Sequence, residues 1–217
     1  MNIKKLILEG EGVTVDFKKT ITSFEKIAKT MTAFANSRGG RLLIGVEDTG
    51  EIIGVRSEEE EKFMIRKAGS DYCKPSIVPH FEEVYLDNRM VLVAEIRESS
   101  SKPQYALSEE KKWWAYMRVN DKSVLASKIM VDVLKKKGSG EEILLKFTDK
   151  EKLLLEHLQE HEKITFREYC KLAGMNRKKA SRALVNLILM GLIRVHTAEK
   201  KEFYSATGKN YSDIARL

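Results

Sequence analysis

The chain has 217 residues, of which 42% are hydrophobic and 33% are charged, which indicates a folded globular protein and excludes a disordered one. It contains no apolar run of about 18 residues and no long apolar signal core, so we predict a cytoplasmic protein without a membrane partner. Its net charge is +7, and residues 148–217 hold 14 Lys or Arg against 9 Asp or Glu. This uneven distribution favours a polyanionic partner for the last third of the chain.

The first strong pattern is helical and covers residues 24–35, where apolar side chains recur at the spacing of one helix face. Thr22, followed three residues later by Glu25, predicts a capping box at the start of this helix. Gly39 and Gly40 predict its end, because a positive φ costs glycine little.

An apolar strand is predicted next, over residues 42–46. It has no polar alternation, so we expect it inside a sheet that is covered on both faces. Asp48-Thr49-Gly50 then predicts a turn into a further strand at residues 51–55.

The remaining pattern up to residue 137 alternates between helices and strands. We predict helices at 58–68 and 127–137, and strands at 81–85, 90–96 and 113–119. Asp87-Asn88-Arg89 suits a hairpin turn. Residues 1–137 are therefore expected to form an α+β domain with a mixed sheet, and the polar, glycine-containing residues 138–147 a linker.

Residues 148–217 change to short helices with tight connections. Thr148 with Glu151 and Thr165 with Glu168 predict two capping boxes, and Asn176 predicts the N-cap of a third helix. Two short strands follow, joined by a turn at residues 198–201. Three helices followed by a β-hairpin resemble a winged helix-turn-helix.

Several motifs in the first domain resemble a known family, the AlbA-like nucleic-acid-binding domain of Schlafen proteins and many prokaryotic regulators. They are Glu11–Lys18 (EGVTVDFK), Ala33–Asn36, Gly39-Gly40, Leu43–Asp48, Lys102-Pro103 and Tyr116–Val119 (YMRV). The resemblance covers roughly residues 5–137 and implies nucleic-acid contact by this domain. Asp16 stands where the family usually has Glu.

The third helix of the last domain is the candidate reading element for duplex DNA. Its apolar face predicts that five other residues point outward, namely Arg177, Lys178, Ser181, Arg182 and Val185. Arg can bond guanine bidentately, whereas Lys178 and Lys179 suit phosphates. Lys200 and Lys201, at the tip of the predicted wing, suit the DNA backbone or minor groove.

A second group of cations surrounds the family motifs in the first domain. It consists of Lys18, Lys19, Arg38 and Arg41. Together with backbone amides near Gly39-Gly40, these cations could hold phosphate groups. The alternative is a helix-to-strand joint whose glycines serve backbone geometry and whose cations are solvated.

Glu11, Asp16 and Asp48 form the one cluster with a possible chemistry. The resemblance implies that such acids can form a divalent-metal nuclease site, in which carboxylates orient a water against a phosphodiester. The alternative is that they are ordinary solvated acids at strand ends. The Gly40-x4-Gly45 spacing lacks the Lys-Ser/Thr of a P-loop, so no nucleotide cofactor is predicted.

We therefore predict an α+β protein with an AlbA-like domain and a small C-terminal winged-helix domain. Its expected function is that of a prokaryotic, homodimeric DNA-binding regulator of transcription that needs no cofactor or metal. Two alternatives are a metal-dependent nuclease built on Glu11, Asp16 and Asp48, and a protein-interaction or effector-sensing module.

Overall fold

The computed structural model describes residues 3–139, 148–198 and 201–208. The chain divides into two compact units, Met1–Ala126 and Ser127–Leu217, and each is described here by itself. Helices and mixed sheets make up the fold, which confirms the predicted α+β class. Within the described ranges, no helix is both long enough and apolar enough to cross a membrane.

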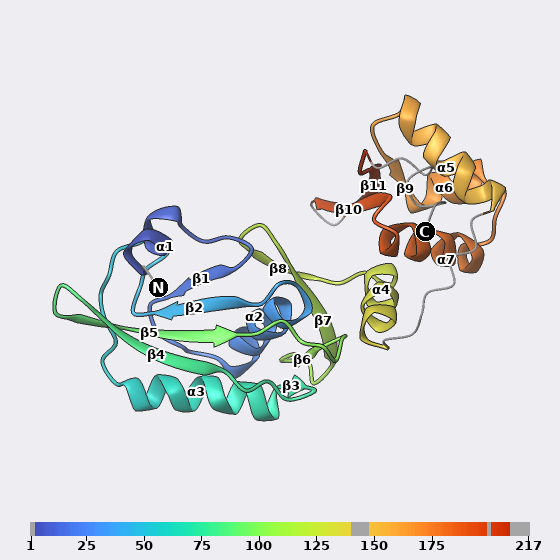
Figure 1. The fold of residues 1–217 in the computed structure, drawn as a ribbon. Coiled ribbons are helices and arrows are strands. Elements are labelled where there is room, and N and C mark those ends of the chain that lie inside the picture. The colour runs from blue at the N-terminus through green and yellow to red at the C-terminus, as the bar shows by residue number, and fades with distance from the viewer. Residues whose placement is uncertain (1–2, 140–147, 199–200, 209–217) are drawn as a thin grey trace. The chain divides into compact units, whose positions relative to one another are not determined.

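The first unit is built on a mixed sheet whose four strands lie side by side in the order β1-β2-β5-β4 (Figure 1). Its strands are β1 (Val15–Lys18), β2 (Gly40–Ile44), β5 (Arg89–Ile96) and β4 (His80–Leu86). β1 and β2 are parallel, and the other neighbouring pairs are antiparallel. The hairpin between β4 and β5 turns at Asp87 and Asn88, which both have positive φ.

Both faces of this sheet are covered by helices. On one face, Leu43 packs with Phe17 and with apolar residues of α1 (Ile3–Glu9). On the other face, Leu42 and Ile44 pack against α2 (Phe24–Asn36). The prediction of an apolar strand buried on both sides is confirmed.

α2 lies between this sheet and a second one, of order β3-β6-β7-β8. The second sheet comprises β3 (Cys73–Lys74), β6 (Tyr105–Leu107), β7 (Trp113–Val119) and β8 (Lys122–Leu125). α3 (Glu58–Asp71) also packs on α2. Burial raises the pKa of the Cys73 thiol to about 12, so this buried cysteine stays protonated.

Two local predictions in this unit are wrong. The N-cap of α2 is Ser23, whose hydroxyl accepts the Lys26 N–H, and not Thr22. Residues 51–55 form no strand and make only one isolated bridge, between Val46 and Ile52. The backbone N–H groups of residues 53 and 54 both bond to the Gly45 carbonyl, so the chain folds back there and cannot extend along a neighbouring strand.

In its described residues, the second unit contains four helices and a three-stranded sheet of order β10-β11-β9. Its helices are α4 (Lys128–Gly138), α5 (Asp149–Glu160), α6 (Phe166–Leu172) and α7 (Arg177–Leu189). Its strands are β9 (Ile164–Thr165), β10 (Ile193–Ala198) and β11 (Lys201–Ala206). Both predicted capping boxes and the Asn176 cap are present.

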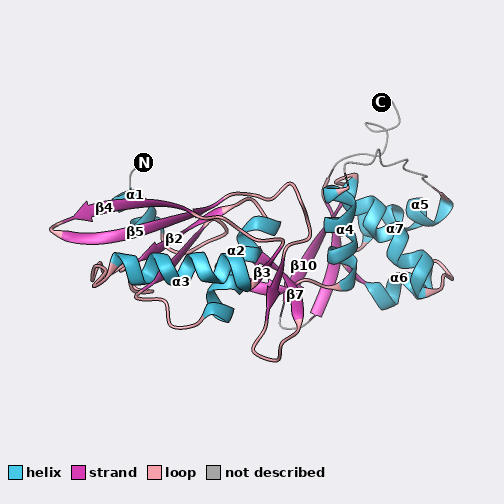
Figure 2. Ribbon diagram, turned by 90° about the horizontal axis from the view of Figure 1, so that it is seen from below, coloured by secondary structure: helices cyan, strands magenta, loops and turns pink. Residues whose placement is uncertain are grey.

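α4 belongs to the core of this second unit. Ile129 and Val133 are buried in the same apolar cluster as Leu184 of α7, and Figure 2 shows the two helices beside each other. The boundary between the units therefore lies at Ala126, earlier in the chain than the predicted linker. Residues 140–147 of that linker lie outside the described ranges.

Candidate nucleic-acid interface

α7 presents its cations on the side away from its core. Ala180, Leu184 and Leu187 are fully buried, with 0% of each residue exposed. Four cations of its first two turns are exposed: Arg177, Lys178, Lys179 and Arg182. The Asn176 Oδ1 accepts the Lys179 N–H at 2.9 Å and so fixes the start of the helix. Apart from one residue, the structure therefore shows the predicted split of α7 into a buried apolar side and an exposed cationic side.

Val185 is an exception to that split, because it was predicted to point outward and is only 3% exposed. α4 covers it with Ile129 and Val133, which belong to the same cluster. Beside it, the Lys136 Nζ donates to the Asn186 Oδ1 at 3.0 Å. The periodicity of α7 could not show this, because the covering helix comes from a segment that was assigned to the other domain.

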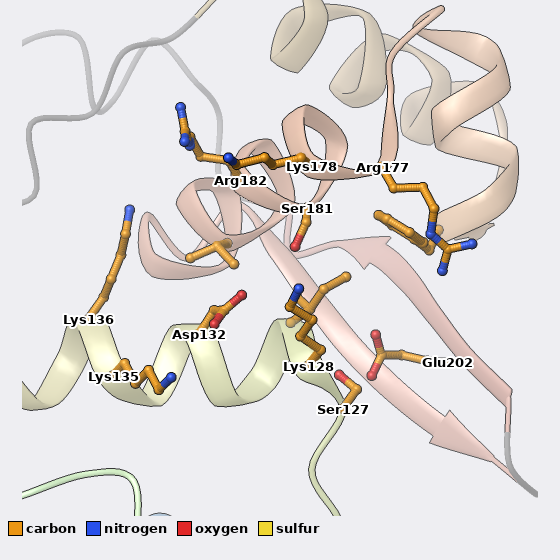
Figure 3. Close-up of a pocket in the computed structure, with 13 residues that line it drawn as sticks. Ser127, Lys128, Asp132, Lys135, Lys136, Arg177, Lys178, Ser181, Arg182 and Glu202 are labelled. Atoms are coloured by element: carbon orange, nitrogen blue, oxygen red, sulfur yellow. The ribbon is translucent and has the colours of Figure 1, made fainter.

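A cleft of about 880 Å³ lies between α4 and the cationic side of α7. Its lining residues are Ser127, Lys128, Ile129, Asp132, Lys135, Lys136, Phe166, Arg177, Lys178, Ser181, Arg182, Val185 and Glu202. In Figure 3, Ser181 of α7 and Asp132 of α4 point into the space between the two helices. Four of the predicted DNA-reading residues thus line one concave surface together with α4.

The α4 cations of this surface were not among the predicted site residues. Lys128, Lys135 and Lys136 all line the cleft. Lys135 and Lys136 belong to a run of lysines that ends at residue 137, which is typical of a helix C-terminus and does not indicate a site, and Lys128 lies outside that run.

Of the two predicted wing-tip cations, only Lys201 lies among the described residues, as the first residue of β11. Lys201 is exposed and pairs with Ala198 across the hairpin. Lys200 lies outside the described residues.

The cations predicted in the first unit are mostly neutralised by carboxylates. Lys18 Nζ lies 2.7 Å from Asp16 Oδ2, and Lys19 Nζ lies 2.9 Å from Glu47 Oε1. Arg41 Nη2 lies 2.8 Å from Glu95 Oε1. Within the described residues only Arg38 of this group has no ion pair, and it is exposed. These cations are therefore less available to phosphate than those of α7.

The glycine pair near them serves the backbone. The Gly39 N–H donates to the Phe34 carbonyl at 2.9 Å, and the Arg41 N–H donates to Thr14 at 2.8 Å. Gly39 has φ +72°, and a Cβ on Gly40 would lie 2.3 Å from the Phe34 ring. These two amides are thus already paired within the backbone, whereas three of the four cations beside them are ion-paired rather than merely solvated.

Asp16 belongs to a buried ion-pair network. Its Oδ1 lies 3.0 Å from Arg118 Nη1, and the two side chains are 6% and 1% exposed. Arg118 Nη2 also donates to the Gly12 carbonyl at 2.7 Å, and its guanidinium lies 4.8 Å from the Phe34 ring centroid. The Asp16 Oδ2 atom lies 2.7 Å from Lys18 Nζ but accepts no hydrogen bond.

The other two acids of the predicted cluster lie nearby. Glu11 accepts the Phe17 N–H at 2.7 Å. Burial raises the pKa of Glu11, against the lowering effect of that hydrogen bond, and the charges of Asp16 and Asp48 raise it further. Among the described residues no group of three or more His, Cys, Asp or Glu is arranged to hold a metal ion. Of these three acids, Asp16 is the one that cations already pair with in this structure.

The first unit thus defines a two-sheet α+β domain whose family motifs meet at the Asp16–Arg118 pair. A family model described as Schlafen, AlbA_2 matches residues 11–127, more than half of the chain. The chain belongs to this family, as its motifs indicated.

Solved structures that are similar to the chain include the following three. A protein from Corynebacterium diphtheriae is 19% identical with a TM-score of 0.45, covering 63% of this chain and 26% of its own. The N-terminal domain of a protein related to the ATP-dependent DNA helicase RecG, from Nitrosomonas europaea, is 19% identical with a TM-score of 0.44, covering 58% of this chain and 94% of its own.

The third is a MarR family transcriptional regulator from Silicibacter pomeroyi, which is 22% identical with a TM-score of 0.28 and covers 31% of this chain and 46% of its own. The chain therefore spans about a quarter of the Corynebacterium protein and about half of the Silicibacter one. Among curated proteins none matches the chain.

Proposed function

We propose that this chain is a DNA-binding regulator of transcription that reads duplex DNA with α7. The order α5-β9-α6-α7-β10-β11, with β9 closing the sheet against β11, resembles that of a winged helix-turn-helix. In that arrangement α7 is the recognition helix and the β10–β11 hairpin is the wing. In the first unit, the amides near the glycine pair already have backbone partners and most of the predicted cations are paired with carboxylates. In this proposal the second unit is therefore the main contact with DNA.

One observation carries the proposal. In the described residues, the exposed cations of α7 form no ion pair with any carboxylate, whereas most predicted cations of the first unit do. An unpaired cation can neutralise a DNA phosphate without first giving up a protein partner, and each phosphate neutralised releases condensed counterions. The N-terminal turns of a recognition helix are also those that reach base edges.

The salt dependence of binding tests this proposal. If about four phosphates are neutralised, log affinity should fall against log salt with a slope of about −4, a loss of about two orders of magnitude between about 50 and 200 mM salt. Fluorescence anisotropy of a labelled duplex across this range measures the slope. Affinity that is independent of salt, or no binding at the lowest salt, contradicts the proposal.

We also propose that the protein binds DNA as a homodimer, with the first unit as the dimer interface. A single small module buries too little surface for tight specific binding, and the second unit must keep its cationic side free. Light scattering at about 20 μM, well above typical specific dissociation constants, should give twice the monomer mass. A monomer at that concentration contradicts this part of the proposal, and a dimer of the isolated residues 127–217 moves the interface to the second unit.

A further inference from the structure

The cleft between α4 and α7 has the size and chemistry of a small-molecule site. Its volume of about 880 Å³ lies within the range of ligand pockets, about 300–1,000 Å³. Three apolar side chains form part of its lining, namely Ile129, Phe166 and Val185. Ile129 and Val185 are 6% and 3% exposed and so provide an apolar surface set into the unit's core.

The charged lining of the cleft is mainly positive. Its cations are Lys128, Lys135, Lys136, Arg177, Lys178 and Arg182, against the two acids Asp132 and Glu202. Glu202 already accepts the Tyr204 hydroxyl. None of these six cations forms an ion pair with another described residue, and Arg177 instead lies 5.2 Å from the Phe166 ring centroid. A concave surface with unpaired cations around apolar side chains is complementary to an organic anion with an apolar body.

In the proposed function, duplex DNA would occupy the same cleft between α4 and α7. Ser181 and Arg182 belong to the side of α7 that enters the groove in the proposed function, and both line the cleft. α4 forms the opposite wall of the cleft (Figure 3). A molecule held between α4 and α7 would cover these side chains and keep α4 packed over Val185.

We propose that this cleft binds a small amphipathic organic anion and that the bound anion excludes duplex DNA from α7. The exclusion of DNA rests on the proposed function, whereas the anion site is inferred from the cleft alone. By linkage, DNA must lower the affinity for the anion by the same factor as the anion lowers the affinity for DNA.

The site can be tested with anilinonaphthalene sulfonate, a fluorescent amphipathic anion, and with neutral phenylnaphthylamine as its uncharged counterpart. The sulfonate should bind with saturation and about tenfold tighter than the neutral probe, because only the anion gains from the lysines. The double change Lys128→Glu and Lys135→Glu should weaken sulfonate binding by about tenfold or more, and Asp132→Asn should strengthen it by about threefold. Lys150→Glu, which makes half of that charge change at an exposed position of α5, is the control and should stay within about twofold.

Circular dichroism should show that each variant keeps its helix content, so that a loss of binding reports the site. Equal binding of the two probes, or equal effects of the Lys128/Lys135 and Lys150 variants, overturns the proposed site. A duplex titration at low salt then tests exclusion, and the DNA should release the bound sulfonate. Simultaneous saturation by both ligands overturns the exclusion.

The two proposals fail in different ways. A salt-dependent DNA complex without sulfonate binding sinks the anion site and leaves the proposed function standing. Sulfonate binding that depends on Lys128 and Lys135, without any DNA binding, supports the site and sinks the proposed function.

Discussion

Replacing Arg118 by alanine is expected to lower the free energy of unfolding of the first unit by about 3–5 kcal/mol, because Asp16 would remain as a buried charge without its main partner. The Arg118 side chain is 1% exposed and donates to Asp16, Ser123 and the Gly12 carbonyl. Alanine would leave these acceptors unpaired and remove the contact with the Phe34 ring. Both tryptophans of the chain lie in β7, so urea unfolding followed by tryptophan fluorescence reports this unit.

Two further variants separate the ion pair from a general effect of removing arginine. Arg97→Ala, at an exposed position on the same unit, should change stability by less than about 0.5 kcal/mol. The double change Asp16→Leu and Arg118→Met should recover most of the loss, because a buried pair replaced by apolar side chains is often neutral. A loss below about 1 kcal/mol in Arg118→Ala would show that the pair is no more than a surface salt bridge.

The Asp16–Arg118 pair includes one of the three acids on which the sequence-based nuclease alternative was built. Asp16 and Asp48 both lie close enough for their charges to act on Glu11. The motif that supplies Arg118 lies a hundred residues further along the chain, and nothing in its spacing indicates that it would close over Asp16. In the folded unit β7, which carries Arg118, packs against α2, and Arg118 Nη1 donates to Asp16 Oδ1 of β1 at 3.0 Å.

Local structure was more predictable than the arrangement of the elements. The capping boxes at Thr148 and Thr165 and the cap at Asn176 were all predicted correctly, because capping depends on residues within one turn. β2 was also correctly predicted as a buried strand, because its unbroken apolar run has few other structures available.

What the sequence could not give was the packing between distant segments. The burial of Val185 depends on α4, whose own amphipathic pattern fits either unit. The pairing of Lys18, Lys19 and Arg41 with carboxylates depends on side-chain geometry that a charge count does not contain. The cleft itself exists only once α4 and α7 lie together, so its three lysines carried no recognisable signal.

Arg182→Ala is expected to relax sequence preference, whereas Lys201→Ala is expected to weaken binding to all sequences about equally. Arg182 is exposed on the side of α7 that the proposal places in the groove, and an arginine there can bond a guanine edge bidentately. Its loss should cost about 1–3 kcal/mol on the preferred duplex and much less on random duplex. The proposal assigns Lys201, at the start of β11, to phosphate contact, so its loss should reduce the magnitude of the salt slope by about one without changing sequence preference.

The measurement begins with selection of a preferred duplex from a random pool by the unaltered protein. Anisotropy titrations of that duplex and of a scrambled one then give a specificity ratio for each variant at fixed salt. Lys150→Ala, at an exposed position of α5, serves as the control for the loss of one positive charge away from the cleft. If Arg182→Ala and Lys201→Ala lower both affinities by the same factor, α7 contacts only the DNA backbone and does not read sequence.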